Sequence, residues 1–178
     1  MIKEFEVNIN KRRFKRKPDN LETAGIQGHF QTEAMPFSQL RQCLVTGCTV
    51  KPAILKADGY FKSQQVFFVD VDRGATVTEN LDKSKKRGIV PNLIYKTFSG
   101  NVKNQKHRLV FVMPEPITDI RERDEIQTKL VALFRGDSLC TNLNRIFYGG
   151  NCQYFYNPYF YTDVEKVRRI RIRIRNPS

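Results

Sequence analysis

The chain has 178 residues, of which 40% are hydrophobic and 11% aromatic, a composition that suits one folded domain with a proper core. No apolar run is long enough to cross a membrane, and residues 1–10 lack the apolar centre of a signal peptide, so we expect a cytoplasmic protein without a membrane partner. The 31 Lys and Arg residues outnumber the 18 Asp and Glu residues, which gives a net charge of +13. A positive field of this size favours a nucleic-acid partner, although a solvated basic surface would have the same composition.

The N-terminal part of the chain is less regular than the rest. Residues 1–20 include a first basic cluster and show little periodicity, so we assign no secondary structure there. Apolar residues recur at helical spacing in residues 37–48, and residues 50–55 favour a strand. We expect these N-terminal α/β elements to flank a central sheet.

Residues 60–150 alternate between strand and helix patterns. Periodicity, caps and turn residues predict strand 65–72, a helix from Thr76 or Thr78 to Gly88, strand 92–99, strand 108–113 ended by Pro114 and Pro116, a helix from Asp119 to Gly136, and strand 144–148. This β-α-β-β-α-β order is typical of an α+β, ferredoxin-like or RRM-like core, with both helices on one face of an antiparallel sheet and the other face free for a site. We predict a single domain over residues 1–178, with its core at about residues 60–150.

A second basic cluster lies in residues 163–178. Arginine and isoleucine alternate strictly from residue 169 to residue 175, which predicts a strand with isoleucines on the core and arginines outside. Arginines on one strand face repeat roughly every 6–7 Å, about the spacing of a nucleic-acid backbone. We favour template contact over an edge strand protected by charge. The arginines concerned are Arg169, Arg171, Arg173 and Arg175.

Two aspartates end the first core strand. Asp70 and Asp72 flank a single residue and therefore project from the same strand face. Neighbouring carboxylates repel each other unless a cation lies between them, and hard oxygen ligands suit Mg²⁺ or Mn²⁺. The pair predicts a divalent-metal site that also takes a substrate phosphate. A solvated strand end before the Arg73-Gly74 turn would explain the same residues.

The expected topology brings further polar residues towards this pair. Asp137 follows the second helix and can supply a third carboxylate. His107, which follows a basic loop, can donate a hydrogen bond to a triphosphate oxygen. Arg145 can bind a phosphate in bidentate fashion, and Gly149-Gly150 allows close backbone approach. These parts predict two-metal nucleotidyl transfer. The catalytic and metal-binding residues are Asp70, Asp72 and Asp137, and the nucleotide-binding residues are His107, Lys103, Lys106 and Arg145.

These motifs resemble those of archaeo-eukaryotic primases. Asp70-Val71-Asp72, Gln105-Lys106-His107 and Asp137 are similar to the D-x-D, s-x-H and hydrophobic-Asp motifs of that superfamily, and residues 97–99, 107–111 and 144–150 resemble its plasmid- and phage-encoded branch. The resemblance implies a DNA primase or polymerase that acts on a single-stranded DNA template with nucleoside triphosphates. It also implies Mg²⁺ or Mn²⁺ on the three aspartates, with His107 on the incoming nucleotide. The chain departs from the family at Gln105, where a small residue is usual, and at Gly136, where an apolar residue is usual.

The resemblance further implies a role in replication of a plasmid, phage or other mobile element. The helicase or accessory module common in relatives is absent, so the chain is either a piece of a longer protein or a stand-alone catalytic domain. A replicative helicase is accordingly a candidate partner.

Two other functions fit parts of the sequence. A non-catalytic nucleic-acid-binding module can use the same sheet, but it stacks bases on aromatic residues where this chain has Asp70 and Asp72. A replication-initiator or relaxase-like endonuclease needs a tyrosine beside a histidine-rich metal site. Residues 154–161 offer tyrosines, which can also stack a base or cover the sheet edge, but the only histidines are His29 and His107. The cysteines are spaced unlike paired zinc knuckles, so we do not expect zinc; they are Cys43, Cys48, Cys140 and Cys152.

Overall fold

The structure, a computed structural model, describes residues 1–100 and 105–172. In chain order the elements are β1 (Phe5–Asn10), α1 (Asn20–Gln27), β2 (Gln31–Met35), α2 (Phe37–Val45), β3 (Thr49–Lys51), β4 (Ile54–Leu55), β5 (Phe61–Val71), α3 (Val77–Arg87), β6 (Leu93–Thr97), β7 (His107–Ile117), α4 (Ile120–Phe134), the 3₁₀ helix η1 (Ser138–Thr141), β8 (Phe147–Tyr148), β9 (Gly150–Tyr156) and α5 (Val164–Arg168). The strands form two antiparallel sheets, in the orders β4-β5-β7-β6-β9 and β2-β1-β3-β8. No helix in the described ranges is long and apolar enough to span a bilayer.

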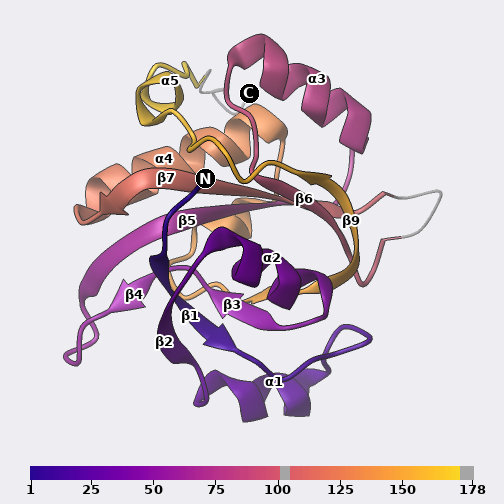
Figure 1. Ribbon diagram of the computed structural model, residues 1–178, viewed down its shortest axis with the longest axis vertical. Helices are drawn as coiled ribbons and strands as arrows, with labels where there is room; N and C mark the ends of the chain where they lie inside the picture. The colour runs from indigo at the N-terminus through magenta and orange to yellow at the C-terminus, as the bar shows by residue number, and fades with distance from the viewer. Residues whose placement is uncertain (101–104, 173–178) are drawn as a thin grey trace, which may run out of the picture.

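The larger sheet has a different cover on each side (Figure 1). Helices α3, α4 and α5 lie on one side, and the smaller sheet with α1 and α2 lies on the other. Both sides of β5 are therefore covered, which explains why its residues 63–71 are all buried and why residues 66–69 form a continuous apolar run rather than an alternating one. Stacking of Phe68 on Phe147, with ring centroids 4.7 Å apart, joins the two sheets, while Phe111 packs on Phe134 of α4.

Both predicted core helices are confirmed, and local chemistry fixes their ends. Thr76 caps α3 in a capping box with Glu79, and Gly88 ends the helix in the left-handed conformation. Asp119 caps α4 by accepting hydrogen bonds from two backbone N–H groups. At the other end of α4 the left-handed position belongs to Arg135 rather than to Gly136. The predicted helix at residues 37–48 is also present, as α2.

The last predicted core strand does not complete an RRM-like sheet. Strands β5, β7 and β6 lie side by side in the order expected for that core, but β8 pairs with β3 in the smaller sheet. Strand β4 takes the place beside β5, and β9 occupies the far edge beside β6. The join of β8 to β3 is extended by a hydrogen bond from the Gly149 N–H to the Cys48 carbonyl at 2.7 Å.

Strand β7 continues past the prolines that we expected to end it. It runs to Ile117, which pairs with Gln64 of β5. On its other side, β6 pairs with β7 only from His107 to Val110. Pro114 and Pro116 therefore lie where one edge of the strand needs no donor to a neighbouring strand, which is where sheets tolerate proline.

The predicted C-terminal basic strand is wrong for the described part of that segment. Asp163 caps the short helix α5 by accepting from the Lys166 N–H at 3.1 Å, and buried Val167 anchors the helix. Residues 170–172 that follow α5 have no strand partner. Arg169 and Arg171 are exposed, whereas Arg173 and Arg175 lie outside the described residues.

The aromatic stretch at residues 154–161 serves partly as packing. Tyr156 stacks on Phe37 of α2 at a centroid distance of 5.7 Å, and the Tyr161 hydroxyl accepts a hydrogen bond from the Lys3 N–H at 2.9 Å. Tyr159 and Phe160 are exposed instead. Tyr156 and Tyr161 thus pack at the edge of the sheet, and covering this edge is one of the two roles that the sequence left open for the stretch.

Candidate functional site

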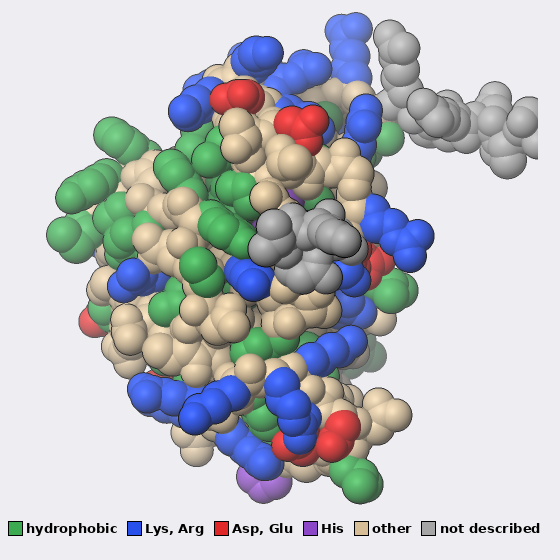
Figure 2. Space-filling view, turned by 90° about the vertical axis from the view of Figure 1, so that its right-hand side faces the viewer, with side chains coloured by type: hydrophobic (Ala, Val, Ile, Leu, Met, Phe, Trp, Pro, Cys, Tyr) green, Lys and Arg blue, Asp and Glu red, His purple; other side chains and the backbone are tan. Residues whose placement is uncertain are grey.

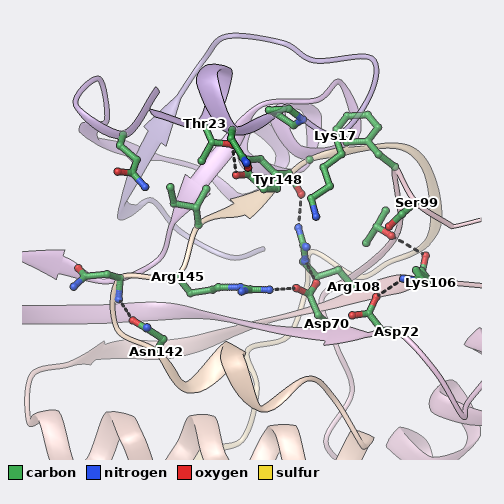
Figure 3. A pocket seen from close by; sticks show the side chains of 18 residues that line it. Lys17, Thr23, Asp70, Asp72, Ser99, Lys106, Arg108, Asn142, Arg145 and Tyr148 are labelled. Carbon is green, nitrogen blue, oxygen red and sulfur yellow. Dashed lines mark hydrogen bonds and ion pairs between the residues drawn. The ribbon is translucent and has the colours of Figure 1, made fainter. Parts of the chain in front are cut away.

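A polar cavity of about 490 Å³ lies between the end of β5 and the N-terminal part of the chain (Figure 3). Asp70 and Asp72 form its floor with Arg108, and Lys17 and Thr23 face them from the opposite wall. The Tyr148 hydroxyl lies 2.8 Å from the Thr23 hydroxyl and links β8 to α1. The site is therefore assembled from the core strands and from N-terminal residues for which the sequence had predicted no structure.

Asp70 is buried and ion-paired. Its partner across the sheet is Arg108 of β7, whose Nε donates to Asp70 Oδ1. The Nη1 atom of Arg108 donates to the Tyr95 hydroxyl at 2.8 Å and to the Tyr148 carbonyl. Burial alone would lower the pKa of Arg108, but the charge of Asp70 and these hydrogen bonds raise it, so the guanidinium stays charged. Burial also raises the pKa of Tyr95 to about 12.

Asp72 lies in a more open place than Asp70. Its side chain is 50% exposed, against 9% for Asp70, and its Oδ1 lies 3.3 Å from Lys106 Nζ. Both residues line the cavity, as the two-residue strand period predicts. An exposed ion pair of this kind contributes only about 0–1 kcal/mol, so Asp72 can exchange Lys106 for another cation at little cost.

Asp137 reaches the site because Gly136 lets the chain approach β5 closely. A Cβ on Gly136 would lie 2.3 Å from Val69 Cγ1. The Asp137 N–H donates to the Asp70 carbonyl at 2.8 Å, and its carboxylate caps η1 through the Leu139 N–H at 3.0 Å. The structure thus brings Asp137 beside Asp70, but Asp137 is not among the residues that line the cavity.

Arg145 lies between these two carboxylates. Its Nη2 atom is 3.4 Å from Asp137 Oδ2 and 3.6 Å from Asp70 Oδ2. Of the glycines that follow, Gly149 lines the cavity. Both are packed closely against backbone, because a Cβ on Gly149 would lie 2.5 Å from the Leu44 carbonyl and one on Gly150 1.9 Å from the Lys96 carbonyl. The close backbone approach predicted for this pair is therefore made to other parts of the chain.

His107 does not lie with these residues. Neighbouring strand residues point to opposite faces, and since Arg108 faces the cavity, His107 faces the helices. The ring is fully buried, its Nδ1–H donates to the Gln105 carbonyl at 2.6 Å, and its Nε2 accepts from Asn80 of α3 at 2.9 Å. We expected His107 beside a triphosphate, and the structure places it on the other side of the sheet.

The other predicted binding residues lie in different places. Lys106 lines the cavity, and Lys103 lies outside the described residues. Arg169 and Arg171 belong to the segment at α5, on the helix-covered side of the sheet, and do not line the cavity. The sequence missed Arg108, although a basic residue in the strand expected to pair with Asp70 was a usable signal. It also missed Tyr148 and Thr23, for which no pattern pointed to a site.

The donor set fits a hard divalent cation at Asp70 and Asp72, because both carboxylates line one cavity and oxygen ligands suit Mg²⁺ and Mn²⁺. A three-carboxylate cluster is not ready-made. Within residues 1–100 and 105–172, no three Asp, Glu, His or Cys side chains are grouped to hold a metal ion. Arg145 separates Asp137 from Asp70, so the third carboxylate joins only if that guanidinium moves.

The arrangement is similar in fold to a solved archaeo-eukaryotic primase domain, which agrees, for the fold alone, with the resemblance carried by the motifs. In particular, the chain is similar in structure to the archaeo-eukaryotic primase domain of the primase-polymerase of cyanophage S-2L. The TM-score is 0.53 and the sequence identity 13%, over 92% of this chain and 88% of that domain. No protein-family model and no curated protein matches the sequence.

Proposed function

We propose that the chain is a template-directed nucleotidyltransferase that makes or extends primers on single-stranded DNA. One observation carries the proposal: in a fold shared with a primase-polymerase domain, Asp70 and Asp72 line a cavity that also holds Lys106, Arg108 and Arg145. Carboxylates for a cation, with basic groups for phosphates around them, are the chemistry of phosphoryl transfer. Replication of a plasmid, phage or other mobile element is the setting that we propose, with a replicative helicase as a candidate partner.

The role that we assign to each side chain of the cavity follows from how exposed it is. Asp72 and Asp70 hold the cation, and Asp137 joins them as the third carboxylate of a two-metal site. Bound Mg²⁺ or Mn²⁺ would lower the pKa of the primer 3′-hydroxyl and neutralise charge on the triphosphate. Lys106 and Arg145 bind triphosphate oxygens, because each is partly exposed in the cavity. Arg108 keeps Asp70 oriented, since it is buried and has three acceptors.

The template path that we propose crosses the N-terminal wall. Lys and Arg side chains gather over the lower part of the face shown in Figure 2, where α1 and the basic segment 11–17 lie. Lys17 of that segment lines the cavity itself. A backbone that follows this wall would release counterions and make binding salt-dependent. The C-terminal arginines, from Arg169 to Arg175, stay a second proposed contact with nucleic acid.

A non-catalytic nucleotide- or nucleic-acid-binding module is the alternative, and one observation favours it. Both oxygens of Asp70 face arginines, and the carboxylates are not grouped as a ready metal site in the described part of the chain. Such a module would bind nucleic acid equally well in chelator and would incorporate no nucleotide.

Asp72→Asn is the variant that best tests nucleotidyl transfer. Asp70 is unsuitable because its loss would leave buried Arg108 without a counter-charge. Asp72 is half exposed, so its variant should fold with wild-type stability to within about 1 kcal/mol. We expect incorporation of labelled nucleotides on single-stranded DNA, with and without a primer and with Mg²⁺ or Mn²⁺, to fall by at least about a hundredfold. DNA binding should persist.

Asp82→Asn is the matched control, because it removes an exposed carboxylate from α3 on the other side of the sheet. It should incorporate nucleotides like the wild type. Undiminished incorporation by Asp72→Asn would refute the assignment. A wild-type chain that incorporates nothing with either metal, yet binds DNA in chelator, would favour the non-catalytic module.

A further inference from the structure

Two arginines face Asp70, and they are held very differently (Figure 3). Arg108 projects from the middle of the larger sheet, with a side chain that is 7% exposed, and it donates to a carboxylate, a hydroxyl and a carbonyl. Its guanidinium also lies 5.0 Å from the centre of the Phe147 ring. Arg108 is therefore a fixed part of the sheet and cannot leave Asp70 without unpacking it.

Arg145 is held more loosely, because its one side-chain hydrogen bond in the described part of the chain, from Nη2 to Asp137 Oδ2, is long at 3.4 Å. It lies in the turn between η1 and β8, where its own N–H donates to the Asn142 carbonyl at 3.1 Å. Its side chain is 31% exposed, and its contact with Asp70 Oδ2, at 3.6 Å, is longer than a hydrogen bond. Its buried Nε atom has no hydrogen-bond partner in the described part of the chain. Leaving such a donor unsatisfied is unfavourable, so Arg145 gains by moving to a better acceptor.

The two carboxylates that Arg145 bridges cannot move in its place. Asp137 is held at its N–H by the Asp70 carbonyl and at its side chain by the cap of η1. Asp70 is held by Arg108. A divalent cation that takes an oxygen from each must enter the space of the Arg145 guanidinium. The cation and the guanidinium are both positively charged and repel each other strongly at such short range.

We infer that Arg145 exchanges between these carboxylates and the triphosphate of an incoming nucleotide, and that this exchange couples nucleotide binding to metal binding. The inference rests on the proposed function, whose nucleotide site it deepens. Without nucleotide, Arg145 neutralises Asp70 and Asp137 and competes with the cation. A triphosphate offers Arg145 several anionic oxygens, including an acceptor for Nε, and draws it away. The carboxylates then become available to the cation, so each ligand raises the affinity for the other.

Direct measurement of Mn²⁺ binding to the nucleotide-free full chain tests the exchange. Free Mn²⁺ is followed by electron paramagnetic resonance for the wild type, for Arg145→Gln and for Arg87→Gln. We expect Arg145→Gln to bind Mn²⁺ at least about tenfold more tightly, in the range of typical coupling between sites. Arg87→Gln removes an equal charge from the exposed end of α3 and should match the wild type. Thermal unfolding of each variant verifies the fold.

A second measurement follows the other partner of the exchange. In chelator, where no metal competes, Arg145→Gln should bind a nucleoside triphosphate at least about tenfold more weakly than the wild type, and Arg145→Lys should recover part of the affinity. This opposite movement of the two affinities is not expected of a residue that only maintains the local structure.

Three outcomes would overturn the inference, and they separate it from the proposed function. Equal Mn²⁺ affinity in Arg145→Gln and the wild type, with binding and incorporation both lost in Asp72→Asn, overturns the exchange and leaves the nucleotidyltransferase standing. Equal tightening in Arg87→Gln overturns it as well, because the effect is then one of net charge. Absence of Mn²⁺ binding in every variant, together with no incorporation by the wild type, overturns both proposals.

Discussion

The two faces of strand β7 differ sharply although neighbouring residues supply them. Arg108 points into the cavity, where its charge meets Asp70. His107, one residue earlier, points to α3 and is hydrogen-bonded to neutral groups of Asn80 and Gln105. One face thus collects buried and half-buried charges of both signs, whereas on the other face both ring nitrogens of His107 are hydrogen-bonded to uncharged groups.

This difference shows that the role of a residue in a strand depends on the face of the sheet to which its side chain points, and not on the residue type alone. A histidine preceded by a lysine resembled a phosphate-binding motif, but strand alternation turns its ring away from the aspartates. The arginine beside it was missed in the sequence, and it is the direct partner of Asp70. On the cavity face the charged side chains pair with one another, whereas on the helix face His107 makes neutral hydrogen bonds within the packed layer.

Of the substitutions that test the difference between the two faces, removal of Arg108 should change the free energy of unfolding most. Arg108→Met leaves the Asp70 carboxylate buried without its main counter-charge, which typically costs about 3–5 kcal/mol. We expect a loss of that size in the free energy of unfolding measured with urea. The double variant with Asp70→Asn should recover part of it, since no buried charge is then left unpaired. A loss below about 1 kcal/mol in the single variant would mean that the charge pair does not hold the cavity face.

Gly136→Ala should change the free energy of unfolding by a smaller amount, through the close contact between residue 136 and β5. The new Cβ would lie 2.3 Å from Val69 Cγ1 and 3.0 Å from the Asp70 carbonyl oxygen, so the chain must shift. Overpacking of this kind costs about 1–3 kcal/mol, and the shift should also move Asp137 and reduce nucleotide incorporation.

Gly25→Ala is the matched control for this change. Gly25 lies in α1 with no atom within 4 Å of the added Cβ, so alanine should stabilise the protein by roughly 0.5–1 kcal/mol. The two substitutions are chemically identical and should shift the free energy of unfolding in opposite directions. Equal effects of both would show that the close approach of Gly136 to β5 is unimportant.

His107 should contribute a pH dependence that belongs to the helix face alone. Burial lowers the pKa of His107 below its usual 6.5, against an opposing effect of the hydrogen bond to Gln105. The unfolded chain therefore binds a proton more readily than the folded chain, so stability is fully present above about pH 6.5 and declines as the pH falls below that value. The slope contributed by one histidine is at most about 1.4 kcal/mol per pH unit.

Urea unfolding between pH 8 and pH 5 measures this slope. His107→Gln should flatten it, and His29→Gln, which removes an exposed histidine, should retain the slope of the wild type. The assignment of His107 to packing fails if the two variants respond to pH alike. It also fails if His107→Gln weakens nucleotide binding while stability and its pH dependence stay as in the wild type.

Much of the fold could be predicted because its signals are local. The cap of α3 at Thr76, the cap of α4 at Asp119 and the apolar run of β5 each depend on residues close in sequence. Pairing partners could not be predicted in the same way. The join of β8 to β3 rather than to β5, and the continuation of β7 past Pro114, depend on strands that are distant in sequence.

The features of the site can likewise be separated into those that depend on local sequence and those that depend on distant contacts. The sequence by itself determined that Asp70 and Asp72 share a face, because the period of a strand is a property of the local backbone. Only the tertiary structure decided that Arg108 and Arg145 neutralise Asp70, that Asp137 arrives beside it through Gly136, and that α1 closes the cavity. The physical reason is range: periodicity and capping act within a few residues, whereas charge pairing and close packing depend on which distant segments the fold brings into contact.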